Sequence, residues 1–462
     1  MRKNRFSIIY YLFISLFVLQ ILFVPATLGA VETWEKTFSR TNNDEGECLI
    51  QTSDGGYAIG GTSGLEINFW LVKIDGSGNE QWAKTYGQGR ERGYSVIQTN
   101  DGGYAMVGIT WQYGPGSSDF WLVKIDGSGN EQWAKAYGGT HYDEGYSVVQ
   151  TSDGGFAIAG YTESFGAGGT DGWLIRVDSG GNLLWNKTFG GTNYDYFYSI
   201  ISTIDGGFAL AGKTYSFGAG NTDFWVVKTD SSGNLQWNKT YGKHPHDDAY
   251  CLIQTSDGGY AIAGTTQSYG ELDPFDVGNP AFWLVKTDPN GVEQWNQFYG
   301  GTIYDEAYSL VQTSDGGYAL VGFSYVERGR NKDFWLGKVD GNGNQQWAQT
   351  FDRDDFDEAK SIIQTNDGGY GIVGTKQTFP ELYSSIWFIK TDEYGNIDPT
   401  SFPTPTLSPT PTPTQSPDPT PTSSSTPEPT PNPEFSFPME YAIGGIVAVV
   451  AVVIAVFFLR RK

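Results

Sequence analysis

The triplet Asp-Gly-Gly recurs along most of this chain, and it constrains the fold more than any other feature. Its spacing lies between 47 and 58 residues, and four of the six intervals are 52 residues. Self-similarity at this period is typical of architectures in which one supersecondary unit is repeated. The repeat fills the chain from about residue 31 to about residue 398. The seven triplets begin at Asp54, Asp101, Asp153, Asp205, Asp257, Asp315 and Asp367.

Each repeat predicts four short strands. The runs are rich in β-branched and aromatic residues, and no run has an apolar period of 3.6 residues long enough for a helix. Gly-rich turns, such as the one that begins at Asp205, separate the runs and make successive strands antiparallel. Seven four-stranded antiparallel units predict an all-β fold, a seven-bladed β-propeller. In the fourth unit the runs are Tyr198–Thr203, Gly207–Gly212, Phe224–Thr229 and Leu235–Thr240.

The two ends of the array predict closure of the ring. The strand Thr33–Phe38 precedes the first triplet, whereas the last unit ends near Asn396 without a Trp-bearing strand. Thr33–Phe38 is therefore expected to complete the last blade, which removes two exposed sheet edges. A β-sandwich and an open β-solenoid remain as alternatives. The Trp-bearing strands contain Trp34, Trp82, Trp133, Trp185, Trp237, Trp295 and Trp347.

The step from Asp230 through Gly233 to Trp237 resembles the repeat of quinoprotein-type β-propellers. In that family the three residues dock one blade on the next. The Gly-Gly pair followed by an aromatic residue is also similar to kelch repeats. The whole array resembles propeller proteins of archaeal and bacterial surfaces. Quinoprotein enzymes of this kind typically have eight blades and adjacent cysteines, and this chain has neither, so we predict no quinone or other organic cofactor.

The segments outside the repeats predict an anchored surface protein. Residues 1–30 have a basic start, an apolar run and small residues before a cleavage position, as in a signal peptide, although a retained anchor is an alternative. Residues 399–438 form a linker rich in Pro, Thr and Ser, which favours an extended stalk. Residues 439–459 predict a transmembrane helix, and the basic tail 460–462 places its end in the cytoplasm. A cleaved lipid-anchor signal is the alternative. The propeller is then extracellular, on a single-pass cell-membrane protein.

The net charge, the cysteine positions and the glycosylation sequons each lead to one prediction. The formal net charge of −23 argues against nucleic acid as a partner. Cys48 and Cys251 occupy the same position in blades that are not neighbours, so we predict two free, buried thiols. Asn186 and Asn238 lie in N-glycosylation sequons, on what is expected to be the outermost strand.

Residues that recur in every blade are interpreted as structural, because they hold the blades together. The Asp of each triplet caps its turn, and each Trp packs between blades. Functional residues are expected where one blade departs from the repeat, in loops on one rim of the propeller. The alternative is that these loops are solvated linkers. The candidate ligand-binding residues are Arg90, Arg92, His141, His244, His246, Glu271, Asp273, Asp276, Arg328 and Arg330.

Calcium is the metal considered for the acidic pairs of these loops. The Asp75 turn fails as an EF-hand, because its sixth position is Glu80 rather than Gly. Motifs of zinc proteases, phosphate loops and serine hydrolases are absent from the sequence. We therefore predict an extracellular binding module for a glycan or a protein, with a polysaccharide hydrolase or lyase and a passive envelope component as alternatives. The acidic pairs are Asp143 with Glu144, Asp305 with Glu306 and Asp357 with Glu358.

Overall fold

The computed structural model describes residues 31–64, 67–242, 246–267, 280–300, 304–325, 332–351, 356–378 and 383–397. All of them belong to the first of the two units into which the chain divides. Within these ranges no helix is long and apolar enough to cross a membrane. The predicted signal, linker, membrane span and basic tail lie outside the described residues, so those expectations stay as predictions.

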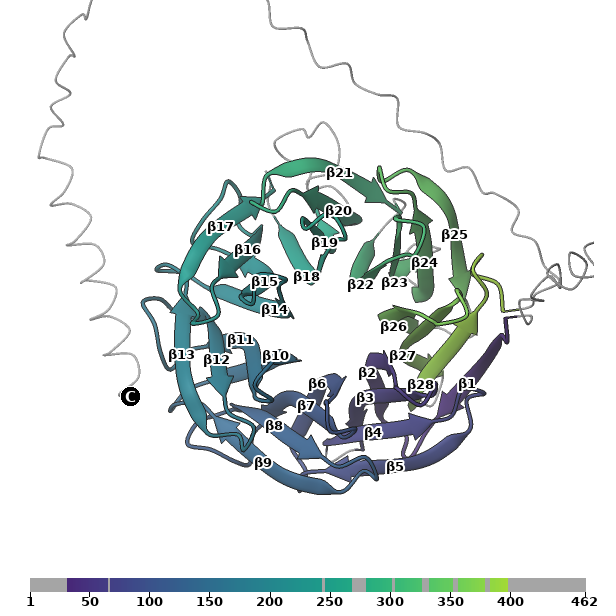
Figure 1. Cartoon of the computed structure of the whole chain (residues 1–462), viewed down its shortest axis with the longest axis horizontal. Coiled ribbons are helices and arrows are strands. Elements are labelled where there is room, and N and C mark those ends of the chain that lie inside the picture. The colour runs from purple at the N-terminus through teal and green to yellow at the C-terminus, as the bar shows by residue number, and fades with distance from the viewer. Residues whose placement is uncertain are drawn as a thin grey trace, which may run out of the picture. The chain divides into compact units, whose positions relative to one another are not determined.

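The described residues form strands β1 to β28, arranged in seven four-stranded blades around a central axis (Figure 1). The first blade is β2 (Asp44–Gln51), β3 (Tyr57–Ser63), β4 (Asn68–Ile74) and β5 (Glu80–Tyr86). The second is β6 (Glu91–Gln98), β7 (Tyr104–Thr110), β8 (Asp119–Ile125) and β9 (Glu131–Tyr137). The third is β10 (Asp143–Gln150), β11 (Phe156–Thr162), β12 (Asp171–Val177) and β13 (Leu183–Phe189). The fourth is β14 (Asp195–Ser202), β15 (Phe208–Thr214), β16 (Asp223–Thr229) and β17 (Leu235–Tyr241).

The remaining blades follow the same order. The fifth is β18 (Asp247–Gln254), β19 (Tyr260–Thr266), β20 (Ala281–Thr287) and β21 (Glu293–Tyr299). The sixth is β22 (Asp305–Gln312), β23 (Tyr318–Tyr325), β24 (Lys332–Val339) and β25 (Gln345–Phe351). The seventh is β26 (Phe356–Gln364), β27 (Tyr370–Thr378), β28 (Tyr383–Thr391) and β1 (Trp34–Phe38).

The amino-terminal strand closes the ring, as the sequence predicts. Strand β1 pairs antiparallel with β28, from Trp34 opposite Lys390 to Phe38 opposite Ile386. The alternatives of a sandwich and an open solenoid are therefore excluded. A single parallel pair, Lys332 with Phe356, links the sixth blade to the seventh. Four other blade junctions carry an equivalent parallel bridge, so this pair is a contact between blades and not a merger of two sheets.

The position of a strand within its blade explains its composition. The second and third strands are buried along almost their whole length, because each is covered by a blade on both faces. The outermost strands, such as β13 and β17, begin with exposed residues. Seven apolar clusters fill the spaces between neighbouring blades, and each combines residues from two blades. The core is therefore a ring of interfaces, and each blade depends on its two neighbours.

The docking role of the tryptophans is visible at every junction. Trp185 in β13 lies 6.4 Å, centroid to centroid, from Phe208 of the next blade. Trp34 makes the corresponding contact with Tyr57 across the closure, at 6.2 Å. The other five tryptophans each pack on the aromatic residue that follows the next Gly-Gly pair, at 5.7 to 6.1 Å. Such edge-to-face pairs add about 1 kcal/mol each to the burial of the rings.

Each Asp-Gly-Gly turn contains an ion pair that the sequence analysis missed. Asp205 accepts hydrogen bonds from the backbone N–H of Gly207 and from Thr203, which confirms its role in the turn. Its carboxylate also receives the Lys228 ammonium at 2.8 Å, and the Lys228 side chain is only 4% exposed. The same arrangement recurs in all seven blades, with Arg176 in place of lysine in the third.

Two smaller expectations are resolved in part. Cys48 and Cys251 are free, as predicted, but both are half-buried rather than fully buried. They face the junctions between first strands, where Cys48 Sγ lies 3.7 Å from the carbonyl oxygen of Val96. Asn186 and Asn238 do lie on outermost strands, β13 and β17, with exposed side chains. Their glycosylation remains a prediction.

Candidate functional site

The first strand of every blade contains a β-bulge at the same position. In β10, for example, Gly145 pairs with Gly160 and Ser147 with Ala159, which leaves Tyr146 without a partner on β11. A bulge turns its extra side chain away from the regular alternation of the strand. We call the seven bulged residues the axial belt. They are Glu47, Tyr94, Tyr146, Tyr198, Tyr250, Tyr308 and Lys360.

Ring contacts connect the axial belt from blade to blade around the central axis. Tyr94 and Tyr146 are stacked with their centroids 4.8 Å apart. Tyr146 to Tyr198, Tyr198 to Tyr250 and Tyr250 to Tyr308 follow at 5.3 to 5.5 Å. The Lys360 ammonium then lies 3.8 Å from the centre of the Tyr308 ring. The belt is therefore aromatic through five consecutive blades and ionic in the seventh and first, where Lys360 and Glu47 replace tyrosine.

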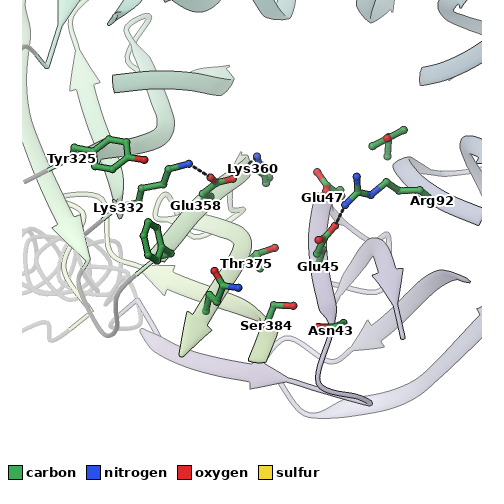
Figure 2. A pocket seen from close by; sticks show the side chains of 13 residues that line it. Asn43, Glu45, Glu47, Arg92, Tyr325, Lys332, Glu358, Lys360, Thr375 and Ser384 are labelled. Carbon is green, nitrogen blue, oxygen red and sulfur yellow. Dashed lines mark hydrogen bonds and ion pairs between the residues drawn. The ribbon is translucent and has the colours of Figure 1, made fainter. Parts of the chain in front are cut away.

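A cavity of about 670 Å³ opens at this ionic part of the belt (Figure 2). We call it the channel pocket. Blades one, two, six and seven supply its walls, and the belt residues Glu47, Tyr94 and Lys360 line it. Its volume is within the range of sites that bind small molecules or short oligomers. Tyr325 and Lys332 also line it, and the predicted candidates Arg328 and Arg330 lie between them in the sequence.

Three cations and three carboxylates meet in the channel pocket, and Figure 2 shows how they pair. Arg92 of β6 forms an ion pair with Glu45 of β2. Lys360 lies 2.8 Å from Glu358 on the same strand, and Lys332 of β24 approaches the other oxygen of that carboxylate. Glu47 forms no hydrogen bond or ion pair within the described part of the chain.

The two kinds of carboxylate in the channel pocket differ in their acidity. Burial raises the pKa of Glu47 to about 7, against the opposing charge of Lys360. Burial would also raise the pKa of Glu358, but Lys360 and Lys332 outweigh it and hold that pKa below its usual value. The same pocket thus combines a carboxylate that stays ionised with one that exchanges its proton near neutral pH.

Of the four predicted rim residues that the structure describes, Arg92 alone lines the channel pocket. Arg92 lines the channel pocket, whereas Arg90 and His141 are exposed and lie outside its lining. His246 is half-buried, with its Nδ1 3.4 Å from the Thr222 hydroxyl, and also lies outside the lining. The other candidates, His244, Glu271, Asp273, Asp276, Arg328 and Arg330, lie outside the described residues.

The acidic pairs considered for calcium diverge, because adjacent residues of a strand point to opposite sides. In the third blade, Asp143 is fully buried and accepts hydrogen bonds from the Ser164 hydroxyl and the Gly139 backbone N–H. Its neighbour Glu144 instead accepts from the belt residue Tyr146. Asp305 and Asp357 are equally buried, whereas Glu358 faces the channel pocket. Among the described residues, no group of three or more His, Cys, Asp or Glu side chains is placed to hold a metal ion.

The sequence contains a signal for the axial belt in the first strand of each repeat. Tyrosine precedes serine or cysteine in the first strand of five blades, at Tyr94-Ser95 and its equivalents. Glu47 and Lys360 are the two departures from this repeat, and they belong to blades that become neighbours only when the ring closes. Departures from the repeat therefore mark candidate functional residues in the first strands of the blades as well as in the loops.

The described residues form a seven-bladed β-propeller, and an ionic cavity lies beside its axis. No family model matches the chain. A protein of Caulobacter vibrioides described as regulatory protein FlaEY is 29% identical over 161 residues, which is 31% of this chain and 16% of that protein. The match therefore spans about a sixth of that relative's length.

The chain matches solved structures only at low sequence identity. The WD40 domain of Neurospora crassa Pan2 has a TM-score of 0.45 and 11% identity, over 76% of this chain and 97% of that one. Puromycin hydrolase has a TM-score of 0.45 and 13% identity, over 75% of this chain and 52% of that one.

Proposed function

We propose that the protein is a membrane-anchored extracellular binding module whose channel pocket binds a glycan. The observation that carries this proposal is the pocket itself, an ionic cavity of about 670 Å³ at the two blades whose belt residue is not tyrosine. Tyr94, Tyr325 and Phe356 supply ring surface for the apolar faces of sugar rings, and the ion-paired side chains supply donors and acceptors for hydroxyl groups. The anchored, extracellular location is supported by the sequence of residues 1–30 and 399–462.

A glycan panel tests the proposal. The full-length chain in mild detergent is applied to the panel and compared with Lys332→Met, which removes one cation of the pocket. The matched control is Lys213→Met, because Lys213 forms a 2.8 Å ion pair with Asp248 but does not line the pocket. We expect saturable binding that Lys332→Met weakens at least tenfold and Lys213→Met leaves unchanged. Binding that both variants retain, or no binding at all, contradicts a glycan site in the pocket and favours a protein ligand elsewhere or a passive envelope role.

A second candidate function is hydrolysis of a polysaccharide in the same pocket. The observation that favours it is the opposite displacement of two carboxylate pKa values, upward for Glu47 and downward for Glu358. General acid and base in glycosidases are separated in this way. Release of reducing ends from the glycan that binds, lost in Glu47→Gln, supports hydrolysis. Binding without turnover leaves the binding module as the function.

A further inference from the structure

The channel pocket contains more cationic side chains than carboxylates that form ion pairs with them. Arg92 is engaged by Glu45, while Lys332 and Lys360 both approach the single carboxylate of Glu358. Three positive charges therefore have two committed negative partners. Among the described lining residues, only the ionised form of Glu47 balances these charges, yet Glu47 forms no ion pair with any of the three cations.

Glu47 is surrounded by groups that act on it from three strands. Glu45 lies on its own strand, Arg92 and the Tyr94 ring on β6, and Glu358 and Lys360 on β26. The two cations favour an ionised Glu47, and the two glutamates oppose it. Burial decides the balance, so that Glu47 holds its proton up to about pH 7. In that form the described lining residues have one uncompensated positive charge, and Glu47 has a carboxyl O–H available as a donor.

We propose that the channel pocket selects a ligand that bears a carboxylate, such as a uronic acid residue of a glycan, and that Glu47 takes up one proton as this anion enters. This inference rests on the proposed function and names its ligand class. The ligand carboxylate replaces the charge of Glu47 beside Lys360. The proton comes from solvent, binds a Glu47 carboxylate oxygen, and is returned when the ligand leaves, so the step is balanced without any other reactant.

The test is isothermal titration of the full-length chain with trigalacturonate, at pH 6 and pH 8, in buffers of different ionisation enthalpy. Carboxyl-reduced trigalacturonate, which is neutral, is the matched ligand. We expect the acidic trimer to bind at least tenfold more tightly than the neutral one at pH 6. At pH 8 we expect uptake of close to one proton and an affinity about tenfold lower, because one protonation is linked to binding above the pKa of Glu47.

Two variants identify the group that takes up the proton. Glu47→Gln keeps the shape and the donor but cannot ionise, so it should bind the acidic trimer at pH 8 as tightly as the native chain does at pH 6, without proton uptake. Lys213→Met is the control and should retain the native pH dependence. If Glu47→Gln does not fold, buffer-dependent heats of the native chain still measure the uptake, and Lys360→Met should weaken the acidic trimer at least tenfold and the neutral one little.

The outcomes separate the two proposals. If the neutral trimer, or other neutral glycans of the panel, bind in the pocket as well as the acidic trimer, this inference is wrong and the glycan-binding function stands. Proton uptake that is absent from the native chain, or persists in Glu47→Gln, also overturns the inference. If neither trimer binds and the panel is blank, both proposals fail.

Discussion

The ion pair inside each Asp-Gly-Gly turn predicts an asymmetric response to mutation. In the fourth blade, the Asp205 side chain is 52% exposed, whereas the Lys228 side chain is 4% exposed. Lys228 Nζ also donates to the Thr229 carbonyl at 2.8 Å and to Gln236 Oε1 at 2.9 Å. Asp205→Asn removes the compensating charge but keeps an oxygen for the turn, and it leaves a buried ammonium. Lys228→Met removes that ammonium and leaves a carboxylate that water can reach.

The expected losses of stability differ because Lys228 is buried and Asp205 is half-exposed. The pKa of Asp205 is lowered to about 2, because its bonds to Lys228 and the turn outweigh its burial. The displacement of this pKa from 3.8 corresponds to a stabilisation of at most about 2.4 kcal/mol by the ionised carboxylate. Screening by solvent at the half-exposed carboxylate reduces this contribution to about 1 kcal/mol. Leaving a buried charge unpaired costs about 3 kcal/mol. We therefore expect Asp205→Asn to destabilise by about 3 kcal/mol and Lys228→Met by about 1 kcal/mol.

Thermal unfolding of the full-length chain measures the difference. For a domain that spans residues 31–397 the unfolding entropy is about 0.8 kcal/mol/K, so the two substitutions lower Tm by about 4 °C and about 1 °C. The double variant should be more stable than Asp205→Asn alone. Because the folded-state pKa is depressed, the contribution of Asp205 is complete above about pH 4 and is lost as the pH falls through about 2. A smaller effect of Asp205→Asn than of Lys228→Met at pH 7 refutes the reasoning.

Two further predictions concern the ring. Asp119 is 1% exposed, and burial followed by the charge of Asp143 raises its pKa to about 6, so its stabilising protonated form is lost as the pH rises from about 4 through about 6. Asp119→Asn should stabilise the propeller at pH 8 by up to about 3 kcal/mol, measured by urea unfolding. If the substitution leaves the pH dependence of stability unchanged, the pKa of Asp119 is not raised. Gly233 has φ +75°, and an added Cβ would lie 2.7 Å from the Trp185 ring, whereas Gly206 has φ +81° with no neighbour within 4 Å. Gly206→Ala should therefore cost about 1 kcal/mol, from backbone strain alone, and Gly233→Ala about 2 to 4 kcal/mol. Equal losses in Tm argue against a docking role for the Trp185 contact.

The repeat determined the fold because its signals are local. Equivalents of the Gly-rich turn at Asp205 and of the docking Trp185 recur along the repeat. The additional strand before Asp54 predicts that the ring closes. The axial side chains were harder to assign, since the bulge at Tyr146 shifts the alternation within the strand by one residue. Lys228 was also missed, because a lysine between apolar residues is normally expected to reach solvent.

The sequence by itself determined the number of blades, the antiparallel order within each blade and the strand that closes the ring. Tertiary structure alone decided which side chains share the channel pocket. Glu47 and Lys360 are separated by more than three hundred residues, and only closure of the ring makes their blades neighbours. The raised pKa of Glu47 is a product of the same closure, because it depends on burial and on charges supplied by three different strands.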